Sequence, residues 1–202
     1  TAGNPNTIVT SAVTRTAATN PNLTMTSDGD LTLGAAIDLG TGTFVATVDA
    51  NDDEAGAGSA TLAVNGAPTA GVITLTGGSV TGGVDDGTDG TGDVINVNAN
   101  VTASTGALTI QDAAVVNLVA VGTQLTGVSV DASNDVGVIN LTGGGAMGIT
   151  ATGGVVAIGA PITEALASDL TIAATGNVTT AAITLGVTAG STLSITADSD
   201  ST

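Results

Sequence analysis

Four aspartates in one glycine-rich stretch are the residues best placed to do chemistry in this chain. Asp85, Asp86, Asp89 and Asp93 all fall within residues 85–93. Calcium prefers several carboxylate and carbonyl oxygens on a flexible loop, and these side chains could supply them. The end of the stretch approaches the calcium-binding pattern G-G-x-G-x-D-x-U-x, although Asp93 directly follows a glycine where the pattern needs an intervening residue. A solvated acidic turn explains the same residues and is the favoured interpretation.

Other kinds of site lack their usual residues. Asn51, Asp52, Asp53 and Glu54 form a weaker calcium candidate of the same type. The sequence contains no His, Cys, Tyr, Trp or Lys, so the usual groups for general acid–base and nucleophilic catalysis are missing. Carboxylates are present, but without cationic or aromatic neighbours that would bind a sugar. We therefore expect no enzymatic activity, no small-molecule substrate and no required cofactor apart from optional Ca²⁺.

The charge balance excludes further classes of partner. The formal net charge is −17, and Arg15 is the only cation. One Arg cannot build a phosphate-binding patch, so the chain is not expected to bind nucleic acid or an anionic membrane surface. Apolar residues come in short pieces, so membrane insertion is not expected either. The lack of Lys leaves tryptic proteases almost nothing to cut, which favours a secreted, extracellular location.

Short aliphatic–x–aliphatic triplets recur along the chain, and such triplets are typical of strands. One series, at offsets of 20 to 23 residues, consists of Leu108–Ile110, Val128–Val130, Ile149–Ala151, Leu170–Ile172 and Leu193–Ile195. A second series, at offsets of 21 to 23 residues, consists of Ile73–Leu75, Ile95–Val97, Val116–Leu118 and Ile139–Leu141. Repeats of this length, made of strands without helices, indicate a solenoid.

We therefore predict an all-β protein, a parallel β-helix with rungs of about 20–23 residues and roughly nine rungs. The outer residues of each triplet should point inward and the middle residue outward. The first series then predicts a ladder of Thr and Ser hydroxyls, and the second predicts an amide ladder through Asn96, Asn117 and Asn140. The alternative is an antiparallel β-sandwich that polymerises by donor strand.

The chain reads as one elongated β domain over residues 1–202. Residues 1–28 are expected to form an N-terminal strand, a cap or a segment exchanged between subunits. Residues 29–92 are expected to form irregular rungs with acidic loops, residues 93–198 regular rungs, and residues 199–202 a tail. The only helix-like stretch is Thr163–Ala167, which would make barely one turn.

The segments Asp169–Gly176 and Gly190–Ala197 resemble the repeats of filamentous-haemagglutinin-type and autotransporter adhesins. That resemblance covers residues 93–198 well and the remainder loosely. It implies a secreted parallel β-helix at a bacterial surface, and it carries over no functional residues. The composition, rich in Thr, Ala, Gly, Val and Asp, is also similar to that of bacterial surface-layer proteins.

These observations favour a structural subunit of an extracellular filament whose partner is the chain itself. A solenoid without caps leaves strand edges that template further pairing, and open head-to-tail contacts make filaments. Residues 7–19 could then cross to a neighbouring subunit as a strand. A surface adhesin stalk and a calcium-dependent surface-layer protein are the two alternatives.

Overall fold

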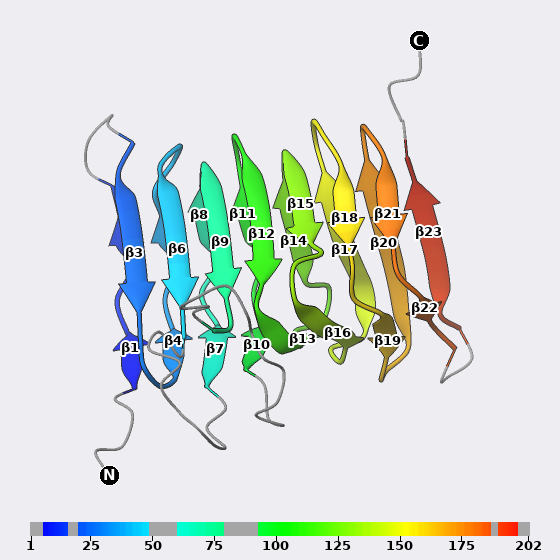
Figure 1. Ribbon diagram of the computed structural model, residues 1–202, viewed down its shortest axis with the longest axis horizontal. Helices are drawn as coiled ribbons and strands as arrows, with labels where there is room; N and C mark the ends of the chain where they lie inside the picture. The colour runs from blue at the N-terminus through cyan, green and yellow to red at the C-terminus, as the bar shows by residue number, and fades with distance from the viewer. Residues whose placement is uncertain (1–5, 16–19, 49–59, 79–92, 187–189, 198–202) are drawn as a thin grey trace.

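The computed structural model describes residues 6–15, 20–48, 60–78, 93–186 and 190–197. All the regular secondary structure of these residues is β-strand, and every strand pair among them is parallel. The chain coils through three sheets in turn and forms a β-solenoid of about 7 turns (Figure 1). The predicted fold class is therefore confirmed, and the antiparallel alternative is wrong for the described strands. No helix long and apolar enough to cross a membrane occurs in this part of the chain.

Each sheet takes one strand from every coil of the chain. Sheet A contains β1 (Thr7–Val9), β4 (Leu31–Leu33), β7 (Thr61–Val64), β10 (Val94–Val97), β13 (Ala113–Leu118), β16 (Val136–Leu141), β19 (Ile162–Glu164) and β22 (Ile183–Thr184). Sheet B contains β2 (Val13–Thr14), β5 (Ile37–Asp38), β8 (Pro68–Ala70), β11 (Val101–Ala103), β14 (Gln124–Gly127), β17 (Gly145–Ala151), β20 (Ser168–Ala174) and β23 (Thr192–Thr196). Sheet C contains β3 (Asn22–Thr26), β6 (Thr43–Thr47), β9 (Val72–Thr76), β12 (Ala107–Gln111), β15 (Ser129–Ala132), β18 (Val156–Ile158) and β21 (Val178–Thr180).

The core is a set of aliphatic columns that run along the axis of the rod. Alternate residues of each strand point inward, so like residues stack from one rung to the next. In sheet A one such column passes through Leu62, Ile95, Val116 and Ile139, all of which are buried. Phe44, the only aromatic residue of the chain, is buried in sheet C. Backbone pairing and apolar stacking therefore act along the same direction.

The amide ladder predicted for the second series of triplets is confirmed in sheet A. Asn96, Asn117 and Asn140 lie in register on β10, β13 and β16. The Asn117 amide donates a hydrogen bond of 2.8 Å to the Asn96 carbonyl oxygen, and Asn140 donates one of 3.0 Å to Asn117. The Asn117 amide in the middle thus gives one bond to the preceding rung and receives one from the next.

The hydroxyl ladder predicted for the first series is confirmed only for Thr171 and Ser194, which are paired in sheet B, because the series mixes two sheets. Thr109 in sheet C faces Asp131, whereas Ser129 faces Ala107. A threonine column does exist, but it lies in sheet B and passes through Thr69, Thr102, Thr126 and Thr150. Turns of different length join the strands, so equal spacing in the sequence does not place residues in the same sheet.

The corners of the solenoid require particular backbone conformations. Asp112 and Asp135 adopt positive φ angles of 52° and 49°, a region that Asp and Asn tolerate better than most residues. The stretch Thr163–Ala167 is not helical: it contains the end of β19 and a bend. The estimate of nine rungs is also too high, because sheets A and B contain eight strands and sheet C contains seven. The acidic insertions account for the difference, since they add residues without adding rungs.

Replacement of Asn117 by Ala tests the amide ladder. The variant loses two hydrogen bonds, and each net bond contributes about 1 kcal/mol, so the free energy of unfolding should fall by about 2 kcal/mol. Urea unfolding followed by circular dichroism measures the change. Thr163→Ala, one rung beyond Asn140 in the same column, is the control and should have a smaller effect. Equal losses in both variants would contradict a specific role for the amides.

Candidate functional site

The predicted calcium residues lie mostly outside the described part of the chain. Asp85, Asp86 and Asp89, like the weaker candidate at residues 51–54, are not among the described residues. Asp93 is described, and its carboxylate accepts a 2.7 Å hydrogen bond from the backbone amide of Ala60 at the start of the neighbouring rung. Among the described residues, no three His, Cys, Asp or Glu side chains are grouped so that they could hold a metal ion. Calcium binding by the full set of aspartates stays a prediction.

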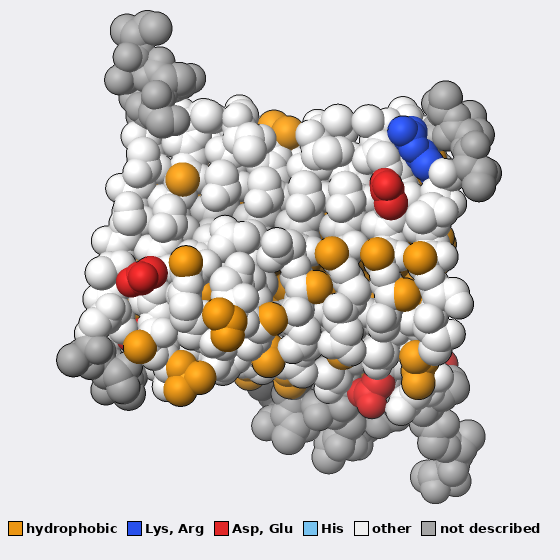
Figure 2. All heavy atoms as spheres, turned by 180° about the vertical axis from the view of Figure 1, so that it is seen from behind, with side chains coloured by type: hydrophobic (Ala, Val, Ile, Leu, Met, Phe, Trp, Pro, Cys, Tyr) orange, Lys and Arg blue, Asp and Glu red, His pale blue; other side chains and the backbone are white. Residues whose placement is uncertain are grey.

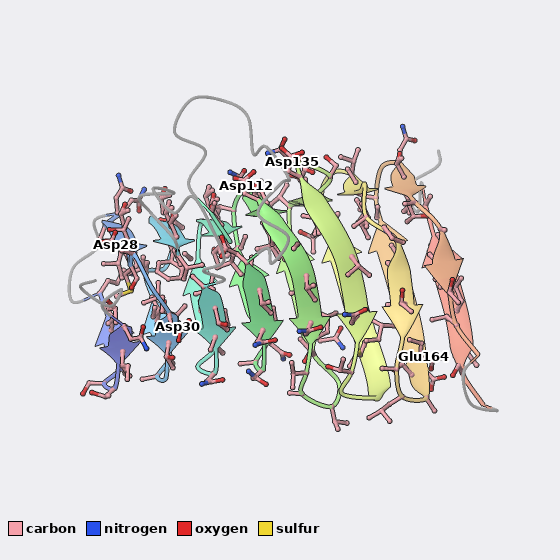
Figure 3. The ribbon with its side chains drawn as sticks, turned by 60° about the horizontal axis from the view of Figure 1, so that its bottom comes forward. Asp28, Asp30, Asp112, Asp135 and Glu164 are labelled. Carbon is pink, nitrogen blue, oxygen red and sulfur yellow. The ribbon has the colours of Figure 1, made fainter. Side chains whose placement is uncertain are left out.

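An acidic corner separates sheet C from sheet A. Asp28, Asp30, Asp112 and Asp135 all lie in the connections between strands of these two sheets (Figure 3). The carboxylate of Asp30 accepts a hydrogen bond of 2.9 Å from the Thr61 amide on the next rung. These contacts are of the kind that satisfies backbone donors at a turn, so the described corner residues have a structural explanation.

The Asp112 carboxylate makes side-chain contacts to its own rung and to the next one. One oxygen accepts a 2.8 Å hydrogen bond from the Gln111 amide, and the other accepts a 3.3 Å bond from the Asn134 amide. The backbone amide of Asp112 donates to the Asn134 carbonyl oxygen at 3.2 Å. Asp112 therefore fixes two successive corners relative to each other.

Glu164 is the most unusual residue of the core. Its side chain takes the inward place that Leu118 and Leu141 occupy in the two preceding rungs, and only 1% of Glu164 is exposed. The carboxylate accepts hydrogen bonds from the Ser168 amide at 2.5 Å, from the Gly186 amide at 2.6 Å, and from the Ser191 hydroxyl. Burial of a charged group is unfavourable unless it is hydrogen-bonded, and these three donors satisfy the carboxylate.

The donors show what Glu164 does in the fold. Ser168 is the first residue of β20, just after the bend that follows Glu164, whereas Gly186 and Ser191 lie in the connection between β22 and β23 on the last rung. The carboxylate thus joins the last rung to the rung before it (Figure 3). Every buried side-chain nitrogen and oxygen among the described residues has a hydrogen-bond partner, so Glu164 is best explained as a structural clamp.

Both ends of the solenoid expose their strand edges. β1, β2 and β3 are the first strands of their sheets, and β21, β22 and β23 are the last, so each pairs on one side only within the described residues (Figure 1). Leu193 and Ile195 of β23 continue the buried columns of Leu170 and Ile172, yet they are 45% and 47% exposed. At the other end Val9, Val13, Leu23 and Met25 are only partly buried.

The two end regions differ from the rest of the chain in charge. Residues 1–27 and residues 170–197 contain no Asp or Glu, although the chain has 18 acidic residues. The single cation, Arg15, lies in the first rung, and its side chain folds back over Gly40, where the absence of a Cβ leaves room for the guanidinium. The long side shown in Figure 2 presents mainly uncharged side chains with a few acidic groups. The apolar ends are therefore free of negative side chains in their described parts.

Replacement of Glu164 by Gln tests the clamp. An amide group can present only one acceptor oxygen, so at least one of the backbone donors loses its partner, which costs about 1–3 kcal/mol. Hydrogen exchange at the Ser168 amide or the Gly186 amide should accelerate, and the midpoint of urea unfolding should fall. Asp169→Asn makes the same chemical change at an exposed carboxylate that accepts a bond from Thr192, and it should have little effect. Protection of both the Ser168 and the Gly186 amides at the wild-type level in Glu164→Gln would rule out the clamp.

Comparisons with protein-family models, with curated proteins and with solved structures found no match for this chain. The parallel β-solenoid is consistent with the β-helix repeat proteins whose repeats the sequence resembles. That agreement extends to the architecture alone.

Proposed function

We propose that this chain is a structural subunit of an extracellular filament and that its subunits join end to end by strand pairing. The observation that carries the proposal is the open last rung, where Leu193 and Ile195 remain about half exposed on a strand with one free edge. A free parallel edge offers unpaired backbone donors and acceptors to another strand. Coverage by a further rung would bury both side chains and pair that edge.

Charge favours association through the ends over association through the sides. Of the 18 acidic residues, all except Asp198 and Asp200 lie between Asp28 and Asp169. Two copies that meet end to end therefore bring together regions without carboxylates, and one of these regions carries Arg15. Side-by-side contact through the acidic corner between sheets C and A would bring like charges close together, which is unfavourable. The preferred partner is a second copy of the chain.

The remaining features support a structural role outside the cell. The described polar groups serve turns, ladders and the Glu164 clamp, and the sequence lacks the residues that most enzymes use for catalysis. A chain without Lys and with a single Arg offers one site to trypsin-like proteases, which suits an exposed fibre. An adhesin stalk would use the same fold, with further rungs of its own polypeptide over the end faces.

Electron microscopy and sedimentation of the purified chain test the proposal directly. We expect unbranched fibres that form above a critical concentration, both in calcium and in a chelator. Monomers that persist at high concentration under both conditions would overturn the filament and favour the stalk. Two-dimensional sheets that dissolve on chelation would overturn it in favour of a surface layer.

A matched pair of variants links the fibres to the end face. Ile195→Asp places a charge on the open rung, where the side chain is already half exposed in the single subunit, so the fold should persist while the critical concentration rises at least about tenfold. Val121→Asp adds the same charge at a corner between sheets A and B, where Val121 is 78% exposed, and should leave assembly nearly unchanged. Equal inhibition by both variants would show that net charge, not the end face, controls assembly.

A further inference from the structure

We infer that the junction between two copies is a screw continuation of the coil, in which β1, β2 and β3 of the incoming copy pair with β21, β22 and β23. This inference rests on the proposed function and specifies the partner strands of the same end face. Each sheet would then continue into a different sheet of the next copy: sheet C into A, A into B, and B into C. The observations that carry it are the strand lengths, the connections and the inward side chains.

The first three strands and the last three strands match in length, and one of their two connections matches as well. β1, β2 and β3 have 3, 2 and 5 residues, and β21, β22 and β23 also have 3, 2 and 5 residues. The connection from β2 to β3 comprises residues 15–21, and that from β22 to β23 comprises residues 185–191, so the two are equally long. The other connection differs by one residue, since residues 10–12 join β1 to β2 and residues 181–182 join β21 to β22. The incoming strands can therefore lie over the last three strands with a one-residue difference at one corner.

The inward side chains also match. The patterns of alternation place Leu23 of the incoming copy over Leu193, Met25 over Ile195, and Val13 over Ile183. These are aliphatic contacts of the kind that fills the core of each chain. On the third side Thr7 lies over Val178, and Val9 lies over Thr180. One side of the seam is therefore more polar than the other two.

Stacking with like sheets aligned fits less well. Sheets A and B have eight strands, whereas sheet C has seven, because no sheet C strand follows β23 within the described residues. If β1 of the incoming copy paired with β22 and β2 paired with β23, β3 would lie two strand spacings from β21. That separation is about 10 Å, compared with about 4.8 Å for paired strands, and one strand would be missing. The screw junction leaves no such gap.

Cysteine cross-linking distinguishes the two junctions, and the natural chain contains no Cys to interfere. Ser194 and Thr24 are outward residues at the centres of β23 and β3, and the screw junction places them on adjacent paired strands. Neighbouring residues on such strands lie at a separation that a disulfide can span. We expect fibres of the double variant Ser194→Cys, Thr24→Cys to oxidise into covalent multimers. Each single variant should remain uncross-linked, because a head-to-tail junction never pairs a residue with itself.

The double variant Thr196→Cys, Thr14→Cys is the matched control. These outward residues of β23 and β2 meet only when like sheets are aligned. If this pair cross-links in fibres and the Ser194–Thr24 pair does not, the screw junction is wrong. The proposed filament would still hold in that case, because fibres have formed. Cross-linking of the Ser194→Cys single variant would indicate tail-to-tail contact and overturn it as well. Absence of fibres by microscopy would overturn the filament itself.

The axial repeat gives an independent measurement. The structure describes 23 strands at three per turn, and stacked strands are spaced by about 4.8 Å, so each subunit should add roughly 37 Å to the fibre. Aligned stacking with one vacant place would add about 38 Å, so the rise alone does not separate the junctions. The rotation per subunit does: the screw junction adds about one third of a turn relative to aligned stacking, which helical reconstruction from electron micrographs resolves.

Thr180→Val tests the polar side of the seam. Thr180 points inward, beneath Val9 of the incoming copy, and an apolar side chain there should lower the critical concentration about threefold to tenfold. Thr179→Val changes the neighbouring outward residue of the same strand and is the control, with little expected effect. If the two variants assembled alike, or if Thr180→Val weakened assembly, Thr180 would not lie inside the seam.

Discussion

The structure depends on one constraint: each inward side chain must lie directly over the inward side chain of the preceding rung. Parallel pairing in register imposes this arrangement, and a shift by one residue would turn the aliphatic residues toward water. The buried residues are almost all Leu, Ile, Val and Ala, which can stack as long columns in a narrow interior. Changes of chain length are consequently found at the corners. Residues 49–59 and 79–92 both lie between a sheet C strand and a sheet A strand, while β6 and β9, and β7 and β10, remain paired across them.

The departures from this regularity are informative because each has a local cause. Asp112 and Asp135 occur where a corner needs a positive φ angle, and the Asp112 side chain also contacts the next rung. Glu164 interrupts an aliphatic column, but its oxygens are taken up by donors from two successive rungs. Asp112 and Glu164 therefore act as connections between rungs. Among the described residues, the one buried glutamate lies on the rung before the last.

The repeat length and the strand alternation are readable from the sequence, so the parallel solenoid could be predicted. The amide ladder could be predicted as well, because Asn96, Asn117 and Asn140 occupy equivalent places in strands of one sheet. The assignment of strands to sheets could not be predicted, because connections of the same type differ in length. One residue joins β8 to β9, whereas three residues join β20 to β21. Thr109 and Ser129 therefore look equivalent in sequence although they are not paired in space.

The site features were harder to foresee. The burial of Glu164 depends on Gly186 and Ser191, which come from the following rung and give no local signal. The stretch around Glu164 instead resembled a helical turn, since Glu, Ala and Leu favour helices when considered alone. The correspondence between the first and last three strands becomes visible only when strand bounds are known, because the two segments share few identical residues.

The distribution of carboxylates makes the interactions of this rod anisotropic. Acidic groups on the flanks repel those of a neighbouring rod within a Debye length of about 8 Å at physiological ionic strength, whereas the described residues of the two end rungs, which include Arg15 but no Asp or Glu, do not. The acidic charge of the described residues therefore lies along the sides of the rod and not on its two end rungs. Subunits can then add along the axis while neighbouring rods repel one another. The thickness of a bundle of rods would therefore depend on ionic strength, whereas the structure of each rod would not.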